Sequence, residues 1–100
     1  MEQMVRCPSH PGEILQALYM EPLSLSVEEL ASTLDIPLHT LEDLLNFKTR
    51  ITVDLAMRLS QAFSTTPESW LTAQMNYDLW NARQEMQQWE SIKKLQPQVD

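Results

Sequence analysis

The side chains best suited to chemistry lie between residues 38 and 50. His39 and Asp43 can form hydrogen bonds, and Lys48 and Arg50 follow them with positive charges. Hydrogen-bonding side chains on a helix fit base edges in a DNA groove, and neighbouring cations fit phosphate oxygens. The spacing therefore indicates nucleic-acid recognition, although two adjacent acids lie on the same predicted helix.

Other kinds of chemistry are not indicated. Cys7 is the single cysteine, and His10 and His39 are isolated, so no internal disulfide and no paired metal-ligand motif is possible. The chain has one glycine and no set of nucleophile, base and orienting group. We therefore expect no enzyme, no metal and no cofactor, and we expect His10 to support the N-terminal arm.

Composition limits the class of protein. One hundred residues suit a single domain, and abundant Leu, Glu and Gln with one Gly favour an all-α fold. The first 80 residues hold 11 acids and 4 bases, and the formal net charge of the chain is −7, the wrong sign for a protein that binds phosphates through its overall charge. The longest apolar run, residues 17–20, is too short for a membrane span, and the N-terminus lacks the apolar segment of a secretion signal. We expect a cytoplasmic protein with no membrane partner.

Helical periodicity begins after a short arm, residues 1–9. Pro11 is tolerated in the first turn of a helix, because its missing N–H would have no partner there. Pro22 is expected to end this first helix. The apolar face of the helix consists of Ile14, Leu15, Leu18 and Tyr19.

Two short helices with a tight turn between them follow. Ser26 and Glu29 have the spacing of a capping box, so a helix is expected from Val27 to Leu34. Asp35 tolerates the left-handed conformation of the turn, and a third helix is expected from Leu38 to about Phe47. Helix, turn and helix at this spacing are typical of a helix-turn-helix DNA reader. The buried stripe expected on the third helix is Leu38, Leu41, Leu44 and Leu45.

Two more helices complete the predicted fold. Thr52 can cap a fourth helix, and its expected inward face is Val53, Ala56, Leu59 and Phe63. Thr66 and Pro67 can open a last helix that continues to about Pro97, roughly 28 residues. Its far part carries an apolar seam that needs a partner, either a second copy of the chain or another protein. The seam consists of Met75, Leu79, Ala82, Met86 and Trp89.

Short strings of residues follow the order of these helices and are specific in combination. The strings are His10-Pro11-Gly12-Glu13-Ile14-Leu15, Leu30-Ala31 with Leu41, Leu44-Leu45-Asn46, Ile51-Thr52, Ala56 with Arg58-Leu59, Ala62-Phe63, Thr66-Pro67 with Trp70-Leu71, Gln74, and Tyr77-Asp78-Leu79-Trp80. Together they resemble the HigA/VapI family of plasmid-maintenance antidote proteins, a branch of the Cro/repressor (XRE) domains. The resemblance implies a five-helix, lambda-repressor-like domain over residues 10–82, with an arm at 1–9 and a C-terminal helix extension and tail at 83–100.

The resemblance also implies a function. It implies an antitoxin that binds its operator DNA as a homodimer, represses its own operon and neutralises an mRNA-cleaving toxin of the HigB type. Helix N-termini and cationic loops bind phosphates, and a helix fits the major groove, so the chemistry agrees in part. By position, the base contacts would come from Leu38, His39, Thr40 and Asp43, and the phosphate contacts from Ser26, Lys48, Thr49 and Arg50.

The third helix departs from the family pattern. Where members have Ser-Arg twice and then Gly after the Asn, this chain has Pro37-Leu38, Glu42-Asp43 and Phe47. A carboxylate can accept a hydrogen bond from N4 of cytosine. It supplies none of the counterion-release energy of Arg, so weaker DNA binding is expected. The acids and the two loop cations can also be read as solvated surface. Two alternative functions stay open: a protein-binding module without DNA affinity, and a lone transcriptional regulator without a toxin.

Overall fold

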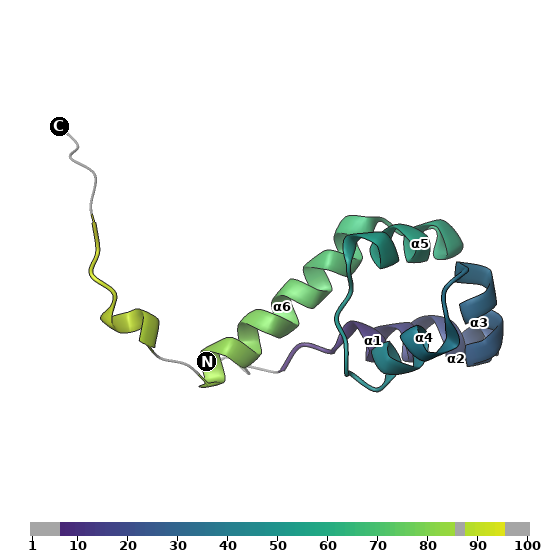
Figure 1. Ribbon diagram of the computed structural model, residues 1–100, viewed down its shortest axis with the longest axis horizontal. Helices are drawn as coiled ribbons and strands as arrows, with labels where there is room; N and C mark the ends of the chain where they lie inside the picture. The colour runs from purple at the N-terminus through teal and green to yellow at the C-terminus, as the bar shows by residue number, and fades with distance from the viewer. Residues whose placement is uncertain (1–6, 86–87, 96–100) are drawn as a thin grey trace, which may run out of the picture.

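The computed structural model describes residues 7–85 and 88–95, and every regular element within them is helical. The elements are α1 Pro11–Leu15, η1 Gln16–Met20, α2 Glu21–Leu23, α3 Val27–Leu34, α4 Leu38–Leu45, α5 Val53–Phe63, α6 Pro67–Glu85 and η2 Gln88–Ser91. Because α1, η1 and α2 join into one helix, the bundle has five main helices, as predicted. Figure 1 shows the first four packed together and α6 leading away from them. None of the helices in the described ranges has the length and apolar character needed to cross a membrane.

The first helix contains a π-helical turn, η1, that its sequence pattern did not predict. Leu15 and Met20, five residues apart, are buried, whereas Leu18 is 64% exposed. A π turn adds a residue to the helical repeat and so shifts the buried face. The prediction that Leu18 faces the core was therefore wrong. The helix also continues one residue beyond Pro22, where it was expected to end.

The ends of α3 follow the predicted local signals. Ser26 Oγ accepts from the Glu29 amide at 3.0 Å, and Glu29 Oε1 accepts from the Ser26 amide at 2.9 Å, which completes the capping box. Asp35 takes the left-handed conformation, with φ at 58°. Arg58 of α5 donates from Nη1 to the Leu34 carbonyl at 2.8 Å. This bond closes the C-terminus of α3 and holds the turn before α4.

The core lies between the first helix, α3, α4, α5 and the start of α6. Its fully buried leucines are Leu15, Leu30, Leu41, Leu44 and Leu59, and Trp70 joins them from α6. Leu38 and Val53 were predicted to face inward and are exposed. Each is the first residue of its helix, and helical side chains point towards the N-terminus, so these two project past the edge of the core.

The last helix is shorter than predicted. α6 ends at Glu85 after 19 residues, η2 is a 3₁₀ turn, and residues 92–95 are not helical, so a continuous helix to Pro97 was the wrong prediction. Beyond the core a helix has only its own propensity to stabilise it. Of the predicted seam, Met75, Leu79 and Ala82 lie on α6, Trp89 lies in η2, and Met86 lies outside the described residues.

Candidate nucleic-acid interface

α4 presents its N-terminus to solvent. Pro37 precedes the helix and provides no side-chain cap. The positive end of the helix dipole is therefore open to an anion such as a phosphate. Leu38 and His39 are exposed at this end and Thr40 is half-buried, so three of the four predicted base-reading residues are accessible together.

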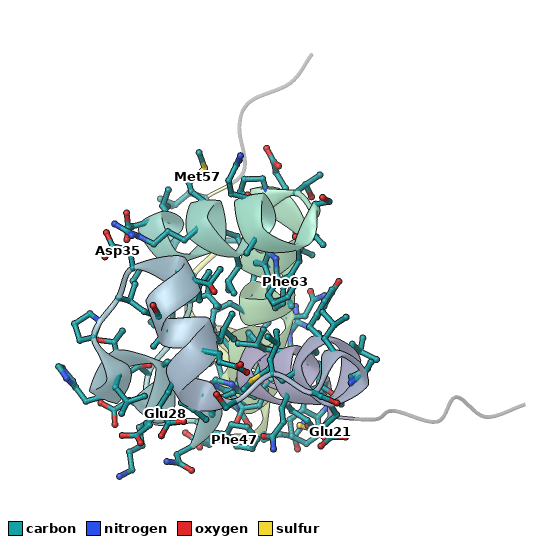
Figure 2. All side chains as sticks on the ribbon, turned by 90° about the vertical axis from the view of Figure 1, so that its right-hand side faces the viewer. Glu21, Glu28, Asp35, Phe47, Met57 and Phe63 are labelled. Carbon is teal, nitrogen blue, oxygen red and sulfur yellow. The ribbon has the colours of Figure 1, made fainter. Side chains whose placement is uncertain are left out.

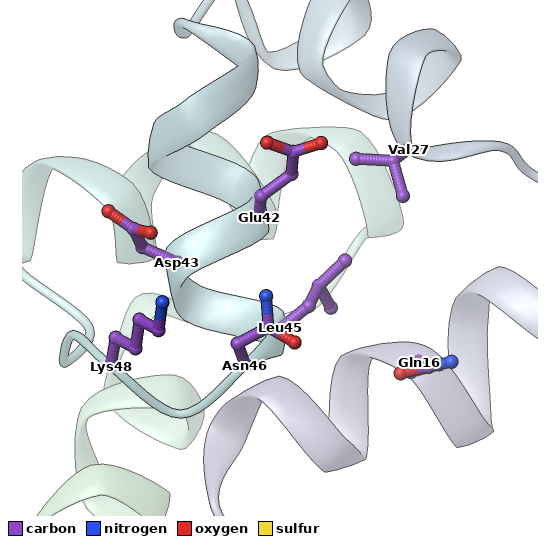
Figure 3. Close-up of a pocket in the computed structure, with 7 residues that line it drawn as sticks. All are labelled: Gln16, Val27, Glu42, Asp43, Leu45, Asn46 and Lys48. Atoms are coloured by element: carbon purple, nitrogen blue, oxygen red, sulfur yellow. The ribbon is translucent and has the colours of Figure 1, made fainter.

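A groove of 510 Å³ lies along the other half of α4, between that helix, the start of α3 and η1 (Figure 3). The Glu42 carboxylate extends towards Val27 at the start of α3, while Asp43 projects on the side of Lys48. A DNA strand at this groove would meet two carboxylates and one amine, which agrees with the weaker binding expected from the sequence. The groove is lined by Gln16, Val27, Glu42, Asp43, Leu45, Asn46 and Lys48.

The loop after α4, residues 47–50, carries two cations that differ in ion pairing. Within the described chain the Lys48 amine makes no ion pair, whereas Arg50 Nη1 lies 2.6 Å from Asp78 Oδ2 on α6. Gln74 Nε2 donates to Asp78 Oδ1 at 3.0 Å, and Gln74 Oε1 accepts from the Ile51 amide at 2.7 Å. Helix α6 therefore holds one end of the loop, and Lys48 can reach a phosphate.

The other end of the loop rests on a histidine. The Phe47 ring stacks on His10 with 4.7 Å between ring centroids, and Tyr77 of α6 packs edge-on against the same imidazole at 4.8 Å. His10 is buried, and its Nδ1 accepts from the Gly12 amide at 2.9 Å. Burial lowers the pKa of His10, and a hydrogen bond with the Thr49 backbone opposes that shift. His10 is therefore a neutral acceptor beneath the loop.

The surroundings of this surface are acidic. In Figure 2, Phe47 lies at the edge where Glu21 and Glu28 also lie, opposite Met57 of α5. Ser26, predicted to contact a phosphate, already donates its amide to Glu29. A phosphate at the start of α3 would therefore compete with a carboxylate. The α4 N-terminus and the cationic loop are the better places for anion contacts.

Sequence reasoning missed His10, Phe47, Gln74 and Asp78 as parts of this surface. His10, Gln74 and Asp78 belong to the strings quoted above, which was the available signal. Phe47 stands where the family pattern described above has Gly, and its left-handed φ of 63° is a conformation that favours Gly.

Named relatives match this chain over most of its length, although no model of a protein family matches it. An uncharacterised HTH-type transcriptional regulator from Haemophilus influenzae is 39% identical over 94 residues, which are 94% of this chain and 88% of that protein. Antitoxin HigA-1 from Vibrio cholerae is 32% identical over 88 residues, which are 88% of this chain and 83% of that protein. The chain belongs to the HigA/VapI family.

Solved structures of an antitoxin have the same fold. The antitoxin GraA is 33% identical, has a TM-score of 0.86, and is matched over 91% of this chain and 100% of GraA. GraA in complex with its operator is 32% identical, has a TM-score of 0.84, and is matched over 97% of this chain and 99% of GraA. The resemblance drawn from the strings is therefore confirmed, and these relatives are named as regulators and antitoxins.

Proposed function

We propose that this chain is an antitoxin that binds its own operator as a homodimer and represses its operon. In this proposal α4 enters the major groove with Leu38, His39, Thr40 and Asp43 at the base edges, and Lys48, Thr49 and Arg50 contact the DNA backbone. The observation that carries the proposal is the likeness, over 97% of the chain, to GraA in complex with its operator. The uncapped N-terminus of α4 and the accessible Lys48 amine agree with it.

DNA binding is tested by titrating a fragment from upstream of the protein's own gene. We expect a complex whose affinity falls steeply with salt. Lys48→Ala with Arg50→Ala should weaken it and reduce the slope of log K against log salt by about 2 per subunit, since each lost phosphate contact contributes about 0.9. Lys93→Ala with Lys94→Ala removes the same charge from exposed residues beyond α6 and should bind like wild type. No complex at low salt would overturn this half of the proposal.

The toxin we propose is a small basic protein of the HigB type that cleaves mRNA. The net charge of −7 complements a basic partner, and the relative HigA-1 is named an antitoxin. The test is to express the protein encoded by the adjacent reading frame with and without this chain. Growth arrest relieved by this chain, with co-purification of the two proteins, is the expected result. A neighbour that neither arrests growth nor binds this chain would contradict it.

The acidic groove favours a second candidate function, a protein-binding module that has lost DNA affinity. Glu42 and Asp43 line the face of α4 that would approach DNA. Carboxylates at that place repel phosphates and suit a cationic protein surface. Co-purification with the neighbouring protein but no complex with the upstream fragment would select this function. A DNA complex without any protein partner would instead identify a lone regulator.

A further inference from the structure

Phe47 ends α4 in a left-handed cap, in which its own amide donates to the Leu44 carbonyl at 3.1 Å and the Lys48 amide donates to the Asp43 carbonyl at 2.8 Å. The cap explains the conformation, but the residue type at this position calls for a physical explanation. Its φ of 63° is unfavourable for a side chain with a Cβ atom, and a bulky residue is rare there. Phe47 is 49% exposed, so burial in the core does not offset the strain. What the ring does have is the stacked contact with His10. The contact therefore accounts for a large residue at a position that suits glycine.

His10 forms a fixed platform for that ring. Its side chain is 3% exposed, its Nδ1 accepts from the Gly12 amide at 2.9 Å, and Tyr77 packs against its edge. The imidazole is therefore attached to α1 on one side and to α6 on the other. A ring stacked on it is held relative to the whole domain.

The rest of the loop has few contacts of its own. Residues 47–50 are all exposed, and a hollow of 240 Å³ lies between the loop and α6. The loop is held at its two ends, by Phe47 on His10 and by Arg50 on Asp78. Between them the Lys48 amide donates to the Asp43 carbonyl at 2.8 Å, and the Thr49 backbone forms a hydrogen bond with His10. Two of these attachments, through Phe47 and Thr49, are made to His10, so the position of the Lys48 side chain depends on that imidazole. Loss of one attachment would leave the loop more conformations to give up on binding.

We propose that His10 and Phe47 are positioning residues for DNA binding: their stacked rings hold the loop so that Lys48 and Arg50 meet phosphates without further ordering. This inference rests on the proposed operator binding. Neither ring needs to touch DNA. The pair acts through the loop.

The same geometry makes the platform sensitive to protonation. A proton on Nδ1 of His10 would remove the acceptor for the Gly12 amide and place two donors face to face. The charged groups around the imidazole are Glu13 on α1, Asp78 on α6, and Lys48 and Arg50 on the loop. The acids favour the imidazolium and the two cations oppose it. Protonation should therefore loosen the loop attachment as the pH falls.

The first test is Phe47→Gly, measured by DNA titration and by thermal unfolding. Glycine relieves the left-handed strain, so the melting temperature should not fall, while DNA affinity should fall about tenfold because one attachment of the loop is lost. Phe47→Tyr keeps the ring and should restore wild-type affinity. Leu23→Ala removes a comparably exposed apolar side chain, 60% exposed, away from the loop and should change nothing.

The second test places Phe47→Gly in the Lys48→Ala and Arg50→Ala background. Without the cations only Thr49 is left on the loop as a proposed DNA contact, so the glycine should cause a much smaller further loss of affinity than in the wild-type background. An undiminished loss in this background, or wild-type affinity in Phe47→Gly alone, would overturn the inference and leave the proposed function standing. Absence of any DNA complex with the wild-type protein would overturn both this inference and the proposed operator binding.

A pH profile separates positioning from simple structural support. The ratio of wild-type to His10→Asn affinity should exceed one at pH 7.5 and shrink towards one as His10 protonates, since Asn retains a capping acceptor but neither stacks nor titrates. His39 is present in both proteins and cancels in the ratio. A ratio that is the same at pH 7.5 and pH 5 would contradict the role of His10.

Discussion

The buried side-chain amide of Gln74 on α6 links Ile51, Asp78 and, through Asp78, Arg50. Its Oε1 accepts from the Ile51 amide, where the loop ends, and its Nε2 donates to Asp78, which pairs with Arg50. Because Gln74 is 3% exposed, water does not replace the hydrogen bonds of its amide oxygen and nitrogen. The position of the cationic loop therefore depends on a neutral residue on α6.

Replacing Gln74 by Leu should lower the free energy of unfolding by about 1–3 kcal/mol, because the Ile51 amide is left buried without an acceptor. Urea denaturation with a constant m-value measures the change. Gln61→Leu, at an exposed position on α5, is the matched control and should change stability little. Equal effects of the two substitutions would mean that the Gln74 bond contributes nothing.

His10 should make the fold less stable in mild acid. Because burial lowers its pKa below the ordinary 6.5, the folded chain binds fewer protons than the unfolded chain at pH values between the two. Its contribution is therefore complete above pH 6.5 and is lost as the pH falls through the folded pKa. Urea denaturation from pH 7.5 to 5 should show a steeper decline for wild type than for His10→Asn. Parallel curves would count against the assignment.

At the scale of elements, the capped helix ends were predictable and the register was not. The caps at Ser26, Asp35 and Thr52 are local signals, and all three have the predicted role. The π turn that buries Met20 in place of Leu18 depends on packing against the other helices, so the spacing within one helix did not predict it. The end of α6 likewise has no proline or glycine to mark it.

The site was predictable only in part, for a related reason. Exposure of Lys48 and Arg50 followed from their place after a short helix. The pairing of Arg50 with Asp78, and of Phe47 with His10, joins residues far apart in the sequence. Those contacts arise from the way α1, the loop and α6 meet, which no local pattern specifies.

Gly12 shows how two elements approach each other too closely for a side chain. Alanine is favoured over glycine in a helix by about 1 kcal/mol. A Cβ atom at position 12 would, however, overlap the carbonyl oxygen of Leu44 and lie 3.0 Å from its carbonyl carbon, and that backbone belongs to α4. Separating two packed helices outweighs the propensity, so Gly12→Ala should destabilise by about 1–3 kcal/mol. Urea denaturation of Gly12→Ala measures this change, with Gln16→Ala, at an exposed position of the same helix, as the control. A Gly12→Ala protein more stable than wild type would contradict the close approach of the two helices.

At the scale of the whole molecule, the proposed function must overcome an unfavourable charge. The chain carries a formal net charge of −7. The cations near α4 are Lys48 and Arg50, and Arg50 is paired with Asp78. One copy therefore offers few phosphate contacts. Two copies on two half-sites double them and add the affinity gain of bivalent binding. The proposed operator binding therefore favours a dimer.

The surface that should form the dimer is the apolar side of α6. Met75 and Leu79, one helical turn apart on a helix that leaves the bundle, are 52% and 40% exposed. Met75→Glu with Leu79→Glu should therefore shift sedimentation at micromolar concentration from dimer to monomer and weaken DNA binding by at least tenfold, because bivalency is lost. The chain offers a competing apolar pair one turn apart on α5, Val53 and Met57, which are 64% and 54% exposed. If Val53→Glu with Met57→Glu breaks the dimer and the α6 pair leaves it intact, the α6 seam is the wrong surface; if wild type itself is only monomeric, the homodimer is wrong.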